Sequence, residues 1–218
     1  AGRTQQLPCT VRQKVFGDFN RSEADKVASG INSEFSEIFW FYPSASSSEN
    51  DKYVIYNYGE KVWYFGSLAR TAWLDRGTRA NPLAAGNQYI FNHEIGFDDD
   101  GSAMTSFIES AAIDIGDGDK FTYIRRVIPD LTFLGSTNLS SPQAVFTVKS
   151  RRFPGASFDN TDAGTAIGSI SGEVETFTEQ LHLRSRGRSF AVRVESTALG
   201  TKWKLGSPRV DLRADGRQ

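Results

Sequence analysis

The chain has 218 residues, of which 39% are hydrophobic and 23% charged, and this composition excludes a disordered or collagen-like protein. A formal net charge of −1 gives no overall attraction to nucleic acid or to an anionic membrane. The single cysteine, Cys9, excludes an internal disulfide, and no apolar stretch reaches the roughly 18 residues of a membrane-spanning helix. We therefore expect one large or two smaller domains without a membrane-spanning segment.

The first predicted element is a short helix over residues 20–35. Apolar side chains recur there at three- and four-residue spacing, at positions 24, 27, 28, 31 and 35. Asn20 is placed to cap its N-terminus, and Glu23, three residues later, to return the hydrogen bond as in a capping box. Gly30 weakens the far end.

Aromatic runs at 38–42, 53–56 and 62–65 predict strands, the last two forming a hairpin. Consecutive aromatic side chains on a strand point to both faces, which favours a sheet buried on both sides over an exposed stacking platform. Such hairpins are typical of β-propeller blades. Only one or two blades are indicated, because no repeat of about 40 to 50 residues continues along the chain.

The second half of the chain consists of short strand-like runs separated by turn residues, with the loop-like segment 154–172 among them. The predicted strands are 88–92, 106–115, 121–128, 144–149, 173–183, 190–195 and 209–213. This density predicts a β-sandwich or barrel-like module. The predicted fold is therefore all-β, with a propeller-blade-like segment at 1–92 that includes the helix, and a β-sandwich-like domain at 93–218.

The sequence offers little catalytic chemistry. His93 and His182 are the only imidazoles, and neither stands in a recognisable motif. The segment 168–172 resembles a nucleophile elbow, but Ile170 occupies the serine position. We predict no enzyme, no cofactor and no metal site. The remaining catalytic alternative is a glycan hydrolase that uses Glu94 with Asp98, Asp99 or Asp100 as its carboxylate pair.

Residues 94–119 contain eight acidic side chains and no lysine or arginine. Asp-Gly pairs favour solvated turns, whereas the segment 114–119 offers carboxylates for calcium without the spacing of an EF-hand. A third interpretation is a repulsive wall that faces passing DNA. The candidate lumen-facing residues on that interpretation are Asp98, Asp99, Asp100, Asp117 and Asp119.

The C-terminal part is basic instead. Arg184, Arg186 and Arg188 occupy alternate positions, and on a strand they would share one face. With Arg193 they are candidates for a subunit interface, while a solvated face or a nucleic-acid patch stays open as an alternative. The acidic tract of one copy is a possible partner for this arginine face in another copy.

Ordered motifs run through the chain from about residue 9 onward. They are 32–44 (NSEFSEIFWFYPS), 49–58 (ENDKYVIYNY), 62–63, 68–73 (LARTAW), 93–94, 108–110, 114–118 (DIGDG), 126–130 (RVIPD), 186–188, 193–196, 203–209 (WKLGSPR) and 215–217. Together they resemble the C-terminal portion of tail nozzle or hub proteins, tail tubular protein B-like, of short-tailed bacteriophages. The resemblance covers most of the chain and rests on several motifs in order.

The resemblance implies a propeller-containing subunit that forms a ring, usually a hexamer, as the conduit for genome retention and DNA ejection. It implies the tail adaptor, tail fibre proteins and passing DNA as partners, and a place in the virion tail after assembly in the host cytoplasm. Proteins of this family are longer, so we expect the preceding blades to come from an N-terminal part of the same protein. A receptor-binding or fibre-attachment module of the tail is the alternative.

Overall fold

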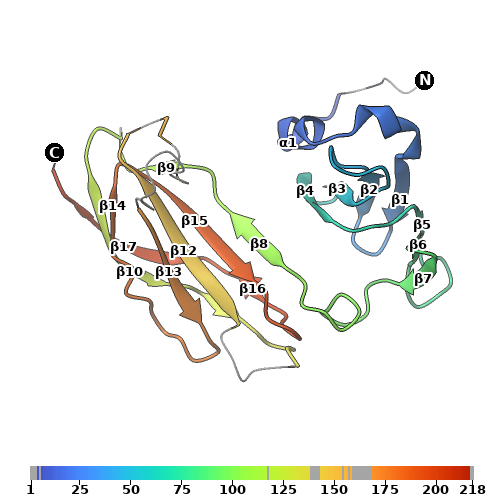
Figure 1. Ribbon diagram of the computed structural model, residues 1–218. Helices are drawn as coiled ribbons and strands as arrows, with labels where there is room; N and C mark the ends of the chain where they lie inside the picture. Colours follow the sequence, from blue (N-terminus) through green and yellow to red (C-terminus); the bar gives the residue numbers. More distant parts are fainter. Residues whose placement is uncertain are drawn as a thin grey trace. The chain divides into compact units, whose positions relative to one another are not determined.

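The computed structural model describes residues 4, 6–116, 118–137, 143–153, 155, 156, 158 and 168–216 (Figure 1). The chain divides into two compact units, Ala1–Ile95 and Gly96–Gln218, which we call unit 1 and unit 2. Antiparallel sheets dominate both, and the described residues contain two short helices, so the all-β prediction is confirmed. Neither of these helices is long and apolar enough to cross a membrane.

Unit 1 contains a four-stranded antiparallel meander. Its strands, in the order β1-β2-β3-β4, are β1 (Ala28–Asn32), β2 (Glu37–Tyr42), β3 (Lys52–Asn57) and β4 (Val62–Ser67). The predicted aromatic hairpin is confirmed, because Tyr56 pairs with Trp63 in the β3–β4 register. Side-chain alternation buries Phe39, Phe41 and Ile55 on one face of this sheet and places Trp40 on the other.

A second sheet of unit 1 contains β5 (Ala72–Leu74), β6 (Leu83–Gly86) and β7 (Tyr89–Asn92). Its Trp73 ring stacks on Phe39 at 4.8 Å and on Phe41 at 6.0 Å between ring centroids. The indole nitrogen donates to the Ile31 carbonyl oxygen at 2.9 Å. A Cβ atom at Gly30 would lie 2.5 Å from the Trp73 side chain, so the glycine is what allows this close approach.

The helix predicted over 20–35 is wrong. Residues Arg21–Lys26 form a 3-10 helix, and the chain then continues as β1 and a turn at 33–36. Asn20 caps the 3-10 helix by accepting from the Ser22 backbone nitrogen, but Glu23 pairs with Lys26 and forms no capping box. Strand pairing with β2 overrides the helical spacing of the apolar residues. The α-helix of the unit, α1 (Arg12–Gly17), lies earlier.

The described residues of unit 2 form three sheets, and the largest has the order β13-β12-β15-β8, with β9 also paired to β15. Its strands are β8 (Ser106–Glu109), β9 (Ile113–Asp114), β12 (Ala144–Arg151), β13 (Ser169–Val174) and β15 (Ser189–Ser196). The second sheet has the order β14 (Ser185–Gly187), β10 (Thr122–Ile128) and β17 (Arg209–Ala214). A small third sheet pairs β11 (Leu131–Thr132) with β16 (Lys204–Leu205).

The two larger sheets of unit 2 share one apolar core, as in a β-sandwich. Ile124 and Val127 of β10 pack in the same buried cluster as Phe146 and Val148 of β12 and Val194 of β15. β12 shows the alternation most clearly, because every second side chain from Ala144 is buried. This arrangement matches the sandwich-like module that the strand density predicts.

Three predicted elements in unit 2 need correction. The strand predicted over 106–115 is two short strands, β8 and β9, because the pairing with β15 is interrupted at 110–112. The strand predicted over 173–183 is β13, which starts at Ser169 and ends at Val174 because a turn follows at 176–177. The loop predicted over 154–172 therefore gives way to strand at its end. Within that loop, residues 154, 157 and 159–167 lie outside the described residues.

Candidate functional site

Unit 1 brings together two carboxylates that are distant in sequence, Glu37 and Glu94. Glu37 begins β2, and its side chain accepts a hydrogen bond from the Tyr64 hydroxyl of β4. Glu94 follows β7, and its Oε1 accepts from Nδ2 of Asn32 at 3.1 Å. Asn32 is fully buried and stands opposite Glu37 in the β1–β2 register. With Tyr53 of β3, these residues form what we call the Glu37–Glu94 cluster.

Burial controls the electrostatics of this cluster. Desolvation raises the pKa of Glu37 above its usual value, although the hydrogen bond from Tyr64 opposes the shift. Desolvation also raises the pKa of Glu94, and the Glu37 charge raises it further. The pKa of Tyr53 is raised by burial and then by both carboxylates. Glu94 is exposed as a whole residue, but its carboxyl group contacts the buried Asn32 amide and is the part that titrates.

The two histidines lie in different units. His93 accepts from Arg70 Nε at 2.9 Å through its Nε2 atom, and its ring lies 4.9 Å from that of Trp73. His182 is exposed in unit 2. Among the described residues, no group of three or more histidine, cysteine, aspartate or glutamate side chains is arranged to hold a metal ion.

The structure places the acidic candidates Asp98, Asp99 and Asp100 in a tight turn of unit 2. Asp99 and Ser102 exchange backbone hydrogen bonds, and both residues between them have positive φ. That geometry is a two-residue hairpin turn, as Asp-Gly sequences favour. The Asp98 side chain stabilises unit 2, because its Oδ1 accepts a hydrogen bond from the Gly200 backbone nitrogen at 2.6 Å.

The remaining acidic candidates are Asp117 and Asp119. Asp119 is exposed, and Asp117 lies outside the described residues. The hydrolase pairing of Glu94 with Asp98–Asp100 joins residues of two separate units. The Glu94 carboxylate accepts a hydrogen bond from Asn32, inside unit 1.

The four arginine candidates divide between the two sheets of the sandwich. Arg184, Arg186 and Arg188 alternate with buried residues in and around β14, as their spacing predicts. The guanidinium carbons of Arg186 and Arg188 lie 4.2 Å and 4.7 Å from the centroid of the Phe121 ring. Arg186 also pairs with Asp215.

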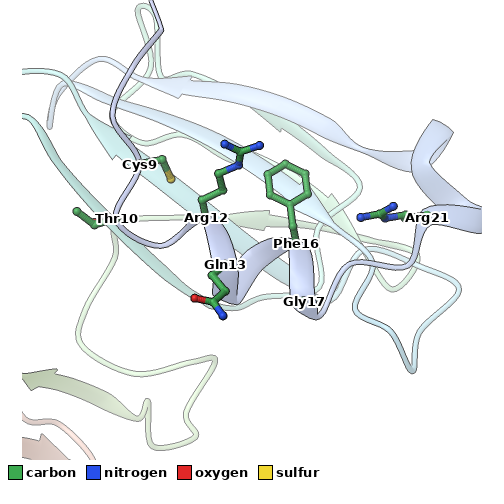
Figure 2. A pocket seen from close by; sticks show the side chains of 7 residues that line it. All are labelled: Cys9, Thr10, Arg12, Gln13, Phe16, Gly17 and Arg21. Atoms are coloured by element: carbon green, nitrogen blue, oxygen red, sulfur yellow. The ribbon is translucent and has the colours of Figure 1, made fainter. Parts of the chain in front are cut away.

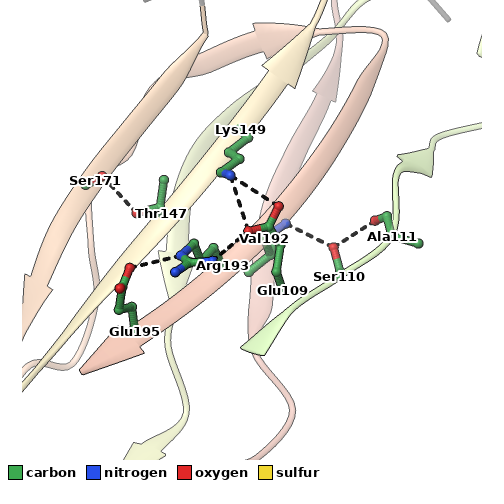
Figure 3. A network of polar contacts seen from close by, with 9 residues as sticks. All are labelled: Glu109, Ser110, Ala111, Thr147, Lys149, Ser171, Val192, Arg193 and Glu195. Carbon is green, nitrogen blue, oxygen red and sulfur yellow. Dashed lines mark hydrogen bonds and ion pairs between the residues drawn. The ribbon is translucent and has the colours of Figure 1, made fainter. Parts of the chain in front are cut away.

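Arg193 belongs to a polar network on the outer face of the largest sheet instead (Figure 3). Its Nη1 lies 3.0 Å from Glu109 and its Nε 2.9 Å from Glu195. Lys149 contacts Glu109 at 3.2 Å, and Thr147 bonds the Ser171 hydroxyl at 2.8 Å. Arg193 is therefore engaged within its own chain, because β12 and β8 present these groups directly beside it.

The N-terminal segment covers the second face of the four-stranded sheet. An apolar groove of about 490 Å³ lies there, lined by Phe16 of α1 and by Trp40, Val54 and Trp63 of the sheet. Trp63 donates to the Pro8 carbonyl oxygen at 2.8 Å. A neighbouring hollow beside α1 is lined by Cys9, Thr10, Arg12, Gln13, Phe16, Gly17 and Arg21 (Figure 2). This sheet thus has apolar cover on both faces.

Comparison with known proteins adds no relative to these observations. No family model and no curated protein matches the chain. The resemblance to phage nozzle and hub proteins therefore stays a prediction from sequence motifs.

Sequence reasoning missed the Glu37–Glu94 cluster. Glu37 stands directly before an aromatic run, and Glu94 precedes a series of acidic residues, so neither position indicates the other as a neighbour. One signal is present: a partly buried glutamate at the start of an apolar strand needs a polar partner. Its partners come from β1, β4 and the segment after β7, which only the fold identifies.

Proposed function

We propose that this chain is a structural subunit of the tail of a short-tailed bacteriophage, from its nozzle or hub. It would assemble as a ring, most simply a hexamer, around the path of the ejected DNA. In this role the chain retains the genome and then conducts it, and it has no catalytic role. Its partners would be further copies, the tail adaptor, tail fibre proteins and an N-terminal part of the same protein.

The observation that carries the proposal is the packing of unit 1. The β1–β4 meander has aromatic residues on both faces, and Trp73 of the next sheet stacks against Phe39 and Phe41. Propeller blades are four-stranded antiparallel sheets that stack face to face through bulky side chains. A sheet with apolar cover on both faces fits an internal blade, which agrees with the sequence motifs that resemble nozzle proteins.

The charged candidates have specific roles in this proposal. Asp98, Asp99, Asp100, Asp117 and Asp119 would line the channel, where like charge keeps DNA from adhering. Arg184 and Arg186, which are exposed, and Arg188, which is partly buried, would contact a neighbouring copy. Arg193 pairs with Glu109 and Glu195, and Arg186 with Asp215, so both would share or exchange these partners at a contact between copies.

Cryo-electron microscopy of the intact virion tests this proposal. We expect density for the chain in a ring on the tail axis, with a central channel and with Arg186 at a contact between copies. Density on peripheral appendages would instead support the receptor-binding or fibre-attachment alternative. Absence of the chain from the tail would refute both functions.

A further inference from the structure

Asn32 leaves a polar atom without a partner in a buried place. The residue is 0% exposed, and its Oδ1 atom accepts no hydrogen bond. The amide nitrogen of the same group donates to Glu94, so the amide head lies within the Glu37–Glu94 cluster. A buried carbonyl oxygen without a hydrogen bond destabilises the fold, and native proteins rarely leave one without a reason.

Two carboxylates accompany this oxygen. Glu37 stands directly opposite Asn32 across the β1–β2 pair, and the Glu37 charge acts on Glu94. The ion pairs described in unit 1 use other carboxylates, those of Glu23, Glu34 and Glu49. A partly buried carboxylate, Glu37, and an exposed one, Glu94, beside a buried unpaired acceptor form an arrangement that favours a positive ion.

We propose that Asn32, Glu37 and Glu94 bind a calcium ion through the Asn32 amide oxygen and the two carboxylates. All three groups present oxygen, which hard cations prefer. Ca²⁺ accepts 6–8 oxygen ligands in flexible geometry and completes its shell with water, whereas Mg²⁺ requires a near-ideal octahedron. Zinc fits poorly, because His93, the nearest histidine in sequence, already accepts from Arg70 through Nε2.

The ion would join the two sheets of unit 1. Asn32 and Glu37 lie at the β1–β2 turn of the first sheet, and Glu94 follows the last strand of the second. With two carboxylates, we expect an affinity in the range of extracellular modules, with a Kd on the order of 10⁻⁴–10⁻³ M. This inference does not depend on the phage function proposed above.

Thermal unfolding of the full chain provides the first test. Tryptophan fluorescence reports chiefly on unit 1, which holds three of the four tryptophans, Trp40, Trp63 and Trp73. Millimolar Ca²⁺, compared with EDTA, is expected to raise the Tm of unit 1 by about 5 °C, and Mg²⁺ by less. Glu94→Gln should abolish the response, whereas Glu60→Gln, an exposed glutamate in the β3–β4 turn, should retain it.

Terbium luminescence provides a direct readout that does not depend on stability. Tb³⁺ bound at the site should be sensitised by excitation of Tyr53 or Tyr64 and displaced by Ca²⁺, and Glu94→Gln should remove this signal. A signal that survives Glu94→Gln would refute the site and point to the acidic residues of unit 2. Equal Tm values in Ca²⁺ and EDTA, with stability that depends only on pH, would refute calcium binding. They would show that protonation of the Glu37 or Glu94 carboxylate is what stabilises the cluster.

Discussion

The two units of this chain form their hydrophobic cores from different kinds of side chain. Unit 2 buries a continuous, largely aliphatic cluster between two sheets, centred on Phe146, Val148 and Val194. Unit 1 has a small buried cluster of Phe39, Phe41 and Ile55, enlarged by stacking with Trp73. The stability of unit 2 therefore depends on the buried apolar area, whereas the stability of unit 1 depends on a few aromatic contacts with specific geometry.

The largest expected effect is the loss of stability on removing a buried ring, and it should be confined to the unit that carries the substitution. Phe146→Ala and Phe41→Ala each remove a ring that is 0% exposed, and each should cost about 3–5 kcal/mol. Hydrogen exchange measured by mass spectrometry should show lost protection in unit 2 for Phe146→Ala and in unit 1 for Phe41→Ala. If either variant lowers protection equally in both units, the units unfold as one cooperative structure and the comparison is wrong.

A smaller effect tests the geometry of the stacking in unit 1. Gly30→Ala places a Cβ atom 2.5 Å from the Trp73 side chain, so the indole or β1 must move. We expect a loss of about 1–3 kcal/mol in the free energy of unfolding and a red shift of tryptophan fluorescence. Gly17→Ala is the matched control, because its added methyl group meets nothing within 4 Å and should be nearly neutral. Unchanged stability in Gly30→Ala would contradict the close approach of β5 to β1.

On the outer face of unit 2, electrostatics should contribute less than packing. Glu109→Gln removes the charge shared by Lys149 and Arg193, and we expect a loss of about 1 kcal/mol that decreases with added salt. The control is Glu173→Gln, an exposed residue of β13 in the same sheet. Urea unfolding at low and high salt measures both variants. An equal effect of the two substitutions would show that the network adds nothing beyond surface charge.

The sequence predicted the strands of both units well, because alternation and aromatic runs reflect local burial. It failed over 20–35, where helical spacing at Ala28 and Ile31 coincided with a strand whose stability comes from pairing with β2. The candidate site was less predictable. Asp98–Asp100 are conspicuous in the sequence and form a turn. Glu94 reaches Asn32, the residue paired with Glu37, only because the segment after β7 folds back to β1. Proximity of this kind has no signal in residue spacing.

The smallest expected effect concerns pH and again distinguishes unit 1 from unit 2. The folded pKa values of Glu37 and Glu94 are raised, so the folded state binds protons more tightly than the unfolded state does. The stability from these protons is fully present below the unfolded pKa, about 4.3, and is lost as the pH rises through the folded values. In EDTA, the Tm of unit 1 should therefore fall with rising pH across this window.

Glu37→Gln should reduce that dependence on pH, because an amide cannot ionise while its oxygen still accepts from Tyr64. The shift will be modest, since both carboxyl groups are only partly buried and water screens their charges. Asp75, whose pKa is lowered by its hydrogen bond with Ser33, acts in the opposite direction at low pH, so the comparison must be made against Glu60→Gln. The same pH slope in Glu37→Gln and in this control would mean that the cluster ionises freely, and that the carboxyl groups of unit 1 are as well solvated as those on the outer face of unit 2.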